Sequence, residues 1–378
     1  MKLAILNLTG GGISGGHKKY LLNILPRLAA SSEIQGILCA APAGIEAEAW
    51  LPRIPGVSYA PCEPFRPFRH SADAGLSAAL DSFKPDLLFV PIERYINYKD
   101  LPVVVMLQNM APLTGARTGS GLKELLVAAL RRHETRIALE RAAAIIVPTE
   151  FVKDFLVSKA GFPAGKITAV HYGHNPASPL ARPPASFPFA GSEFIFTAGS
   201  LEAYRGLEDL VRALPGLRQK RPGIKLAVAG GYRPATEKYF SMLKDLASQL
   251  NVSGDIAWLG DLPEEELSWC YSNCAAFALT SRMESFCFVA LEALTHGCNI
   301  VSADSACLPE ILGEAAVYYK AGDAPGLGRV LETVLARTAG ERRILSEKAS
   351  RSGSGFLWDE TAAKTLDILR RVREDSGK

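Results

Sequence analysis

The chain has 378 residues, with 42 lysines and arginines against 39 aspartates and glutamates, so its formal net charge is +3. Hydrophobic residues make up 48% and charged residues 21%, a globular composition that excludes a disordered chain. This length suits two domains that each bury a core, and the small net charge gives no reason to expect nucleic acid as a partner. Seven cysteines without a C-x-x-C pair indicate reduced thiols rather than disulfides or a zinc site.

Apolar runs such as Ala142–Val147 fall far short of the ~20 residues that a membrane-spanning helix needs. The apolar segment Leu3–Leu8 is too short for the core of a signal peptide and runs directly into glycine. We therefore expect a soluble, cytoplasmic protein. If it contacts a membrane at all, we expect peripheral contact at the inner face.

In the first half of the chain, strand-length apolar runs alternate with amphipathic segments of helix length, which is typical of α/β folds with parallel sheets. A long helix is predicted from Leu122 to Ala142, with Leu125, Leu126, Ala129 and Leu130 spaced to face the core. The predicted strands are Leu3–Leu8, Gln35–Ala40, Asp86–Val90, Val103–Leu107, Ala144–Val147 and Ile167–His171.

The same predicted helix is rich in basic residues. A basic helix can bind an anionic membrane surface, but Glu134 and Glu140 interrupt the basic run here. A solvated helix face is therefore the interpretation that the sequence favours. The basic residues are Arg131, Arg132, His133 and Arg136.

Five prolines between residues 176 and 188 then exclude a helix or an interior strand. We predict a linker at residues 176–192, between an N-terminal domain of residues 1–175 and a C-terminal domain of residues 193–355. After it the alternation restarts, with strands at Phe194–Ala198, Lys225–Ala229, Ile256–Leu259, Ala275–Ala278, Asn299–Ser302 and Val317–Tyr319. Helices are predicted near Leu207–Leu217, Glu237–Leu250, Glu264–Tyr271 and Phe288–His296.

Each half therefore predicts a doubly wound parallel sheet, a fold that binds ligands beyond the carboxyl ends of its strands. We expect two such α/β domains facing each other across a cleft.

A glycine-rich loop, Gly10–Gly16, follows the first predicted strand and contains G-x-G-x-x-G. A dinucleotide site would also need an acidic residue at the end of the next strand, which instead ends Cys39-Ala-Ala-Pro42. A glycine-rich turn that packs a helix or admits another ligand is therefore favoured over NAD binding. His17, directly after this loop, could contact an acceptor or a phosphate, or could face solvent from the first helical turn.

Two carboxylates eight residues apart, Glu284 and Glu292, follow the strand predicted at Ala275–Ala278. We expect Glu284 in the loop before the next helix and Glu292 in its second turn. Between them lie the free N–H groups of the helix start, around Phe286 to Val289, which suit a diphosphate. On spacing alone, a capping acid and a solvent-facing helix acid are the commoner explanation.

The stretch from Glu284 to Leu294, ESFCFVALEAL, resembles the E-x7-E signature of retaining glycosyltransferases with the GT-B fold, those of glycosyltransferase family 4. Further segments that are similar to this family occur in the family's order along most of the chain. They are Gly15-Gly16, residues 148–152 (PTEFV), 172–175 (YGHN), 197–206 (TAGSLEAYRG), 229–231 (AGG), 259–263 (LGDLP), 300–304 (IVSAD) and 308–312 (LPEIL).

The resemblance implies that the C-terminal domain holds a nucleotide-sugar donor and the N-terminal domain an acceptor. It implies that Glu284 binds hydroxyls of the donor sugar, that Glu292 binds the ribose, and that Arg205 binds the diphosphate. Glu284 and Arg205 would be the catalytic pair. The other donor-side residues implied are Gly199, Gly230, Leu262, Phe286, Cys287 and Phe288. The acceptor-side residues implied are Gly15, Gly16, His17, Gln108 and Asn109.

The sequence departs from the family pattern at three places. Cys287 replaces the usual glycine of the E-x7-E loop, and a cysteine cannot adopt every glycine conformation. Ser200 and Arg205 stand where the family has a paired Arg and Lys, so one positive charge is lost. Gln108-Asn109 replaces a common His, a change that could alter which sugar hydroxyl is recognised or lower activity.

We expect a hexosyltransferase-type enzyme that moves a sugar from a nucleotide-diphosphate sugar to a glycan, lipid-linked or small-molecule acceptor with retention. No D-x-D metal motif is present, so we expect no metal and no cofactor besides the donor co-substrate. The alternatives are a nucleotide-sugar-binding protein that has lost turnover and a nucleotide-sugar epimerase of similar fold. Trp358 resembles the start of the family's last helix, which implies that residues 356–378 cross back to the N-terminal domain and that Trp358 serves in packing.

Overall fold

The computed structural model describes residues 1–10, 15–43, 51, 53–115, 121–231, 234 and 236–377. Internal contacts divide the chain into a first unit, residues 1–173 with 357–378, and a second unit, residues 174–356. The predicted linker at residues 176–192 is grouped with the second unit.

The first unit contains a seven-stranded parallel sheet in the order β3-β2-β1-β4-β5-β6-β7. The central strand β1 pairs with β2 and β4, so that Ala4 lies beside Leu38 on one side and Leu88 on the other. The chain reverses its winding direction between β1 and β4, the place where such sheets bind ligands. The strands are β1 (Lys2–Leu6), β2 (Gly36–Pro42), β3 (Val57–Cys62), β4 (Leu87–Val90), β5 (Val103–Met106), β6 (Ala144–Val147) and β7 (Ile167–Ala169).

Strand β3 has no counterpart among the predicted strands. It contains Pro61, which cannot donate a ladder hydrogen bond, and only one of its six side chains is fully buried. Its place at the edge of the sheet explains both features, because an edge strand needs backbone donors on one side only.

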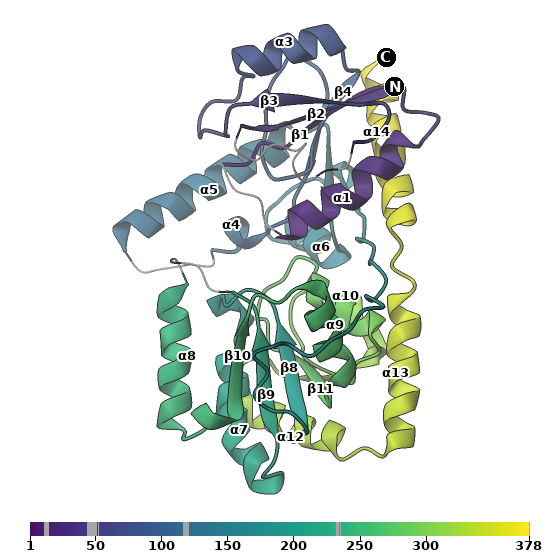
Figure 1. Ribbon diagram of the computed structural model, residues 1–378. Coiled ribbons are helices and arrows are strands. Elements are labelled where there is room, and N and C mark those ends of the chain that lie inside the picture. Colours follow the sequence, from purple (N-terminus) through teal and green to yellow (C-terminus); the bar gives the residue numbers. More distant parts are fainter. Residues whose placement is uncertain are drawn as a thin grey trace. The chain divides into compact units, whose positions relative to one another are not determined.

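Helices cover both faces of this sheet, and the last helix of the chain, α14, packs against α1 and contacts β4 and β6 (Figure 1). None of the described helices is long and apolar enough to cross a membrane. The helices of the first unit are α1 (Gly15–Ala29), α3 (Ala74–Phe83), α4 (Ala111–Thr114), α5 (Leu122–Arg141), α6 (Glu150–Ser158) and α14 (Trp358–Ser376), with a 3₁₀ turn η1 (Ala164–Lys166).

Helix α5 has the predicted length, but the prediction of its core-facing side is wrong. Leu125 and Leu126 are 39% and 64% exposed, Ala129 is exposed, and Leu130 is half-buried. The helix packs through its C-terminal half, and its first turns extend away from the sheet (Figure 1). Its buried side chains are Glu134, Thr135, Ala138 and Leu139.

The second unit contains a six-stranded parallel sheet in the order β10-β9-β8-β11-β12-β13. The fold class is thereby confirmed as two α/β units with all-parallel sheets. The strands are β8 (Phe194–Ala198), β9 (Lys225–Ala229), β10 (Ile256–Gly260), β11 (Ala276–Leu279), β12 (Ile300–Ala303) and β13 (Ala316–Tyr319).

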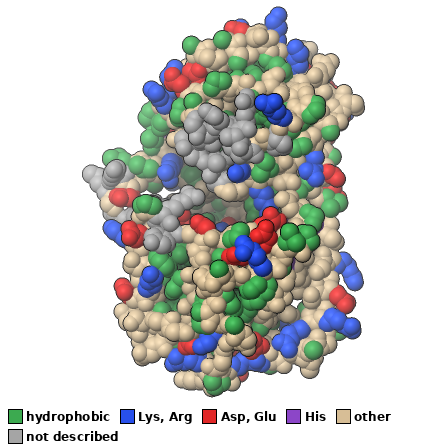
Figure 2. Space-filling view, in the orientation of Figure 1, with side chains coloured by type: hydrophobic (Ala, Val, Ile, Leu, Met, Phe, Trp, Pro, Cys, Tyr) green, Lys and Arg blue, Asp and Glu red, His purple; other side chains and the backbone are tan. Residues whose placement is uncertain are grey.

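Helices α7 and α12 pack side by side in this unit, as do α10 and α13. Basic and acidic side chains are interspersed over the face of the molecule that Figure 2 shows, as the small net charge leads one to expect. The helices are α7 (Glu208–Lys220), α8 (Glu237–Gln249), α9 (Glu264–Asn273), α10 (Phe288–Thr295), α11 (Leu308–Leu312), α12 (Ala324–Leu335) and α13 (Ala339–Gly353). The 3₁₀ turns are η2 (Ala203–Arg205), η3 (Ser253–Asp255) and η4 (Gly313–Ala315).

An aromatic cluster anchors the start of α14 in the first unit. The Trp358 side chain is buried, and its ring lies 6.2 Å, centroid to centroid, from the rings of both Tyr20 and Tyr172. The chain at Gly173 passes so close that a Cβ there would lie 2.2 Å from the Trp358 backbone nitrogen. Packing is therefore the role of Trp358, as expected.

This contact predicts that Gly173→Ala destabilises the protein. The added methyl group would meet backbone, which cannot move aside as a flexible side chain can, so we expect a loss of about 1–3 kcal/mol in the free energy of unfolding. Gly216→Ala is the matched control, because no atom lies within 4 Å of a Cβ at that position in α7. Urea unfolding should show the control unchanged or slightly more stable. Equal stability of the two variants would contradict the close approach.

Candidate functional site

The loops after β8 and β11 bring together the two residues implied as the catalytic pair. Arg205 ends the short turn η2, and Glu284 lies in the loop before α10. The Arg205 Nη1 and Glu284 Oε1 atoms are 3.1 Å apart, and the two side chains are only 14% and 10% exposed. A hydrogen bond of 2.9 Å from Ser281 Oγ also fixes Glu284 Oε1.

The guanidinium of Arg205 remains charged in this buried place. Burial by itself would lower its pKa, but the Glu284 carboxylate, together with Tyr204 and Cys287, outweighs that effect and keeps the pKa above the ordinary arginine value. The Nε and Nη1 groups are buried, and no hydrogen bond to a described residue satisfies them. Arg205 therefore has N–H groups that could donate hydrogen bonds to a bound anion.

The strand ends next to Arg205 approach each other closely through glycine. Gly199 has a φ of +123°, and a Cβ there would lie 2.7 Å from the guanidinium carbon of Arg205. A Cβ on Gly230 would lie 1.9 Å from the Gly199 carbonyl oxygen. The next strand end follows at Asp261, whose Oδ1 accepts a 2.7 Å hydrogen bond from Gly231 N, with half-buried Leu262 after it.

Helix α10 places Glu292 as expected. The helix begins at Phe288, so Glu284 precedes it and Glu292 stands in its second turn. Glu292 is half-buried, and its Oε2 accepts a 2.9 Å hydrogen bond from the Tyr271 hydroxyl. This bond holds the carboxylate in one orientation. A carboxylate fixed in this way would suit a ribose, but the same bond also links α9 to α10.

Cys287 lies in a backbone conformation that favours glycine. Its φ is +75°, in the left-handed region, directly before α10 begins. Such a conformation costs a non-glycine residue roughly 1–2 kcal/mol. Burial, together with the Glu284 carboxylate, raises the pKa of the thiol far above its ordinary value, so the sulfur stays neutral. The buried Phe286 and half-buried Phe288 flank it, with ring centroids 5.4 Å apart.

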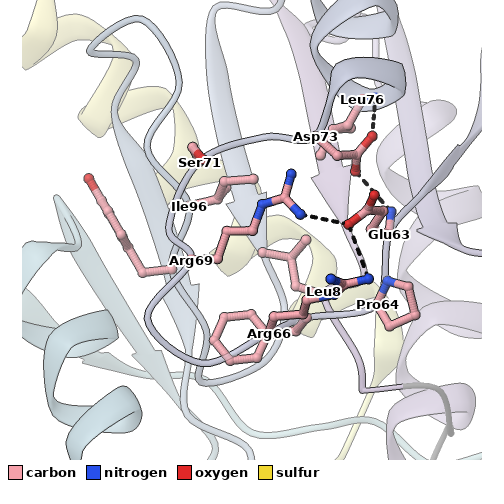
Figure 3. A pocket seen from close by; sticks show the side chains of 11 residues that line it. Leu8, Glu63, Pro64, Arg66, Arg69, Ser71, Asp73, Leu76 and Ile96 are labelled. Carbon is pink, nitrogen blue, oxygen red and sulfur yellow. Dashed lines mark hydrogen bonds and ion pairs between the residues drawn. The ribbon is translucent and has the colours of Figure 1, made fainter.

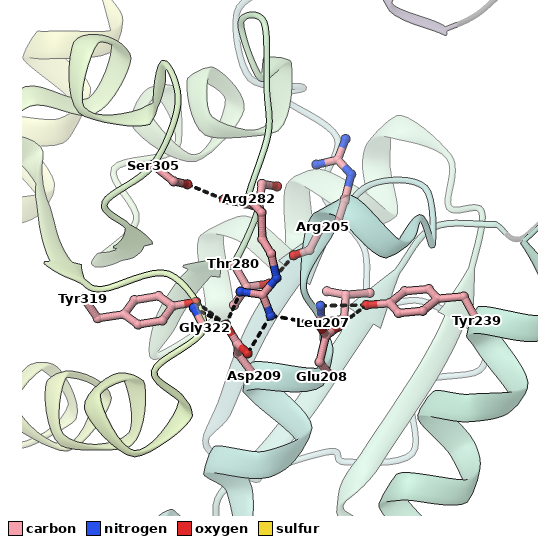
Figure 4. Close-up of polar contacts among 11 residues, drawn as sticks. Arg205, Leu207, Glu208, Asp209, Tyr239, Thr280, Arg282, Ser305, Tyr319 and Gly322 are labelled. Atoms are coloured by element: carbon pink, nitrogen blue, oxygen red, sulfur yellow. Dashed lines mark hydrogen bonds and ion pairs between the residues drawn. The ribbon is translucent and has the colours of Figure 1, made fainter. Parts of the chain in front are cut away.

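A salt-bridge network that the sequence analysis did not identify joins the loops that carry Arg205 and Glu284 (Figure 4). Arg282, two residues before Glu284, directs its Nη2 to Glu208 Oε1 at 2.8 Å and to Asp209 Oδ1 at 2.9 Å. Asp209 is buried and also accepts hydrogen bonds from the Tyr319 hydroxyl and the Gly322 N–H group.

The same network fixes the start of α7, directly after Arg205. The Tyr239 hydroxyl accepts a hydrogen bond from Leu207 N and donates one to Glu208 Oε2. The Thr280 hydroxyl donates to the Arg205 carbonyl at 2.6 Å. Single-sequence spacing could not reveal this arrangement, because Glu208 and Arg282 are 74 residues apart.

In the first unit, His17 and Gln108 come together at the strand ends near β1 and β4. His17 is buried in the first turn of α1, so the possibility that it faces solvent is wrong. Its Nδ1 lies 3.2 Å from Gln108 Nε2, which also donates to the Pro91 carbonyl at 2.8 Å. Burial lowers the pKa of His17 to about 4, against a smaller opposing effect of Gln108, so the ring is neutral at pH 7.

Glu93, in the loop after β4, was missed by the sequence analysis. Burial raises the pKa of its carboxyl, although the Arg94 guanidinium and, to a smaller degree, the backbone N–H groups of Asn109 and Gln108 oppose that shift. The Asn109 side chain is used locally, since its Oδ1 accepts from Ala111 N at 2.9 Å. Of the other implied acceptor-side residues, Gly15 and Gly16 begin α1.

A small pocket also lies at the strand ends of the first unit, beside Leu8, Glu63 and Ile96 (Figure 3). Its free volume of about 30 Å³ is the space of roughly one water molecule, too little for a sugar.

Among the described residues, no group of three or more His, Cys, Asp or Glu side chains could hold a metal ion. All seven cysteines are free thiols, as predicted.

The conformation of Cys287 predicts opposite effects of glycine at two buried cysteines. At position 287 glycine relieves the left-handed conformation, so Cys287→Gly should be more stable than Cys287→Ala by about 1 kcal/mol. At Cys307, where φ is −81°, the Ala variant should be the more stable one. Free energies of unfolding of the four variants test this. The same sign at both positions would show that Cys287 is unstrained.

Two family models match the chain, one after the other. Glycosyltransferase Family 4 matches residues 14–178, and Glycosyl transferases group 1 matches residues 183–352. The chain is 29% identical over 228 residues to a glycogen synthase of Mycobacterium tuberculosis. That match covers 60% of this chain and 53% of the relative, so it spans about half of the relative's length.

Solved structures with the same fold cover nearly the whole chain. Sucrose-phosphate synthase from Thermosynechococcus elongatus has a TM-score of 0.75 at 16% identity and covers 98% of both chains. Anabaena HepE in complex with UDP-glucose has a TM-score of 0.72 at 16% identity, covering 98% of this chain and all of that one. At such identity the likeness concerns the fold. On the two family models, the chain belongs to the family 4, group 1 glycosyltransferases.

Proposed function

We propose that this chain transfers a sugar from a nucleotide-diphosphate sugar to an acceptor hydroxyl, with retention at the anomeric carbon. The observation that carries the proposal is the buried, charged guanidinium of Arg205, whose Nε and Nη1 groups no described residue satisfies by a hydrogen bond. A buried cation with donors to spare, next to the start of α10, fits a diphosphate.

Arg205 would act on the leaving group. In the reaction the bond from the anomeric carbon to the diphosphate oxygen breaks, the acceptor oxygen forms the new bond, and the acceptor proton is released. Negative charge grows on the diphosphate as its bond breaks, and a fixed guanidinium stabilises that charge more than it stabilises the bound donor. No metal ion is needed in this scheme.

Glu284 would have two tasks in this site. Its ion pair with Arg205 holds the guanidinium in place, and its carboxylate can accept hydrogen bonds from hydroxyls of the donor sugar. Glu292 would bind the ribose, with its carboxylate oriented by Tyr271. Gly199 and Gly230 let the strand ends pack closely against Arg205 and against each other, and Leu262 follows the strand end next to them.

On the acceptor side we propose His17, Gln108 and Glu93, at the strand ends of the first unit. UDP-sugars are the first donors to test, because HepE, which has a similar fold, was solved in complex with UDP-glucose. A thermal-shift screen of nucleotide sugars would find the donor, because a ligand at about 100 times its Kd adds ~2.7 kcal/mol of apparent stability.

With the donor identified, Arg205→Ala should lower kcat/KM by a factor on the order of 100, the usual effect of losing one such donor. Arg205→Lys should recover part of the loss, because it restores charge without the planar fork. Arg212→Ala, an exposed arginine of α7, is the control. A decrease in kcat/KM of less than about threefold for Arg205→Ala would show that Arg205 has a structural role only.

If the wild-type chain binds the donor but forms no product, it is a nucleotide-sugar-binding protein and not a transferase.

Glu292→Gln should weaken binding of the nucleoside diphosphate itself, since a neutral amide replaces the carboxylate that accepts from the ribose. Glu332→Gln controls for loss of charge, because Glu332 is a half-buried residue of α12 paired with Lys220 at 2.6 Å. Titration calorimetry of both variants measures the two affinities. Unchanged affinity in Glu292→Gln would leave that residue only its bond to Tyr271.

A further inference from the structure

The turn η2, which carries Arg205, is fixed to the loop after β11 by contacts on both sides of the arginine. Arg282 N donates to the Tyr204 carbonyl oxygen at 2.7 Å, and the Thr280 hydroxyl donates to that of Arg205 at 2.6 Å (Figure 4). Gly206, the residue after the turn, has a φ of +61°, and a Cβ there would lie 2.6 Å from the Thr280 carbonyl oxygen. The backbone of Arg205 is therefore held tightly against this loop.

The Arg282 guanidinium lies against the same turn and ties it to α7. A Cβ on Gly206 would lie 3.2 Å from the guanidinium carbon, and a Cβ on Gly322 would lie 3.2 Å from Nη1. From this position Nη2 reaches both Glu208 and Asp209, the first two residues of α7. The Arg282 side chain is 35% exposed and that of Asp209 is 3% exposed, so the fork is partly shielded from water. Arg282 therefore joins three segments, which are its own loop, the end of η2 and the start of α7.

Glu284 is held by a separate set of contacts. Ser281 Oγ donates to Glu284 Oε1 at 2.9 Å, and the Ser305 hydroxyl, from the loop after β12, donates to the Ser281 carbonyl oxygen. None of these bonds involves the Arg282 side chain. Loosening the Arg282 fork would therefore shift Arg205 more than Glu284, and would change the 3.1 Å separation of the Arg205 Nη1 and Glu284 Oε1 atoms.

The direction of the Arg205 guanidinium depends on the backbone that carries it. Its Nε and Nη1 groups make no hydrogen bond to a described residue, so hydrogen bonds within the described chain do not fix these two groups. A cation that stabilises charge on a departing diphosphate must be in place before that charge grows. A misplacement of about 1 Å can cost on the order of 100-fold in rate. The contacts that fix η2 are therefore the ones that would aim the guanidinium.

We propose that Arg282 is a positioning residue of the transfer site, whose fork to the start of α7 holds η2 so that Arg205 is aimed at the leaving diphosphate. The inference rests on the proposed function, in which Arg205 stabilises that diphosphate. The bound donor is held by other contacts as well, whereas the growing charge depends on the preorganised cation. Loss of the fork should therefore lower kcat more than it raises KM for the donor.

Arg282→Gln tests the proposal, with Arg218→Gln as the matched control. Arg218 is an arginine of similar exposure, 39%, in the last turn of α7, and its Nη1 pairs with Asp255 at 3.0 Å. With the donor found by the thermal-shift screen, we expect Arg282→Gln to lower kcat about tenfold and to change KM for the donor less than about threefold. Arg218→Gln should keep both values, although each variant loses an ion pair. Equal losses of kcat in the two variants would overturn the proposal.

Arg282→Lys keeps the proposal testable if the glutamine variant does not fold. Lysine restores the positive charge beside the buried Asp209 carboxylate but lacks the planar fork. We therefore expect a melting temperature close to that of the wild type and only a partial recovery of kcat. A kcat equal to that of the wild type in Arg282→Lys would contradict a role of the fork.

The double variant Arg205→Ala, Arg282→Gln shows whether Arg282 acts through Arg205. If it does, Arg282→Gln should change kcat by less than about twofold once the Arg205 guanidinium is absent. A further loss of about tenfold in the double variant would overturn the proposal, because the effects of independent residues add in free energy.

Titration of the same four chains with the nucleoside diphosphate of the donor repeats this comparison without turnover. Arg282→Gln should weaken binding about threefold, and only in chains that keep Arg205. Transfer and binding that Arg282→Gln leaves unchanged would overturn this inference alone. A wild-type chain that neither binds a nucleotide sugar nor transfers from one would overturn the proposed function, and this inference with it.

Discussion

The buried carboxylate of Asp209 is the contact on which the loops of the second unit depend. Its oxygens accept from Arg282 in the loop after β11, and from the Tyr319 hydroxyl and the Gly322 N–H group at the end of β13 and just after it. The Asp209 side chain is 3% exposed, so removing Arg282 would leave a buried carboxylate without its counter-charge. The start of α7, the loop after β11 and the loop after β13 are therefore held as one body around this carboxylate.

Arg205 and Glu284 lie in the loops that this network joins, but their own contacts are less complete. Arg205 keeps buried N–H groups that make no hydrogen bond to a described residue, although Nη1 lies 3.1 Å from Glu284, and Cys287 keeps a left-handed backbone. Both features cost free energy in the folded chain and contribute nothing to its packing. Their concentration at the strand ends, beside a fully satisfied network, is the pattern expected where a ligand supplies the missing contacts.

Much of this arrangement follows from local sequence patterns. Buried parallel strands are short apolar runs, so β6, β8 and β9 could be predicted to the residue. Edge strand β3 was not predicted, because it lacks such a run and contains Pro61. The spacing of Glu284 and Glu292 predicted their places around α10 because helix geometry is local.

Other features depend on contacts that local spacing cannot encode. The apolar stripe of α5 has the period of a core-facing helix, yet tertiary structure leaves it exposed, since periodicity reports amphipathicity and not the identity of the partner. The sequence around Glu134 predicts a surface acid. In the structure the loop that carries Phe68 and His70 covers it and hydrogen-bonds to its carboxylate. The fork of Arg282 joins residues 74 positions apart and has no local signature.

Arg205 and Arg282 of the second unit differ in charge from His17 and Glu93 of the first unit. In the second unit, Glu284 with Tyr204 and Cys287 holds the pKa of Arg205 above the ordinary arginine value in spite of burial, so that Arg205 stays charged. Asp209 and Glu208 do the same for Arg282. In the first unit, burial favours the neutral forms: it lowers the pKa of His17 to about 4 and raises that of Glu93. Fixed charge suits a diphosphate, whereas neutral donors and acceptors suit hydroxyl groups without drawing in counter-ions. This division of electrostatics supports a donor site in the second unit and a hydroxyl-bearing acceptor in the first, without reference to any relative.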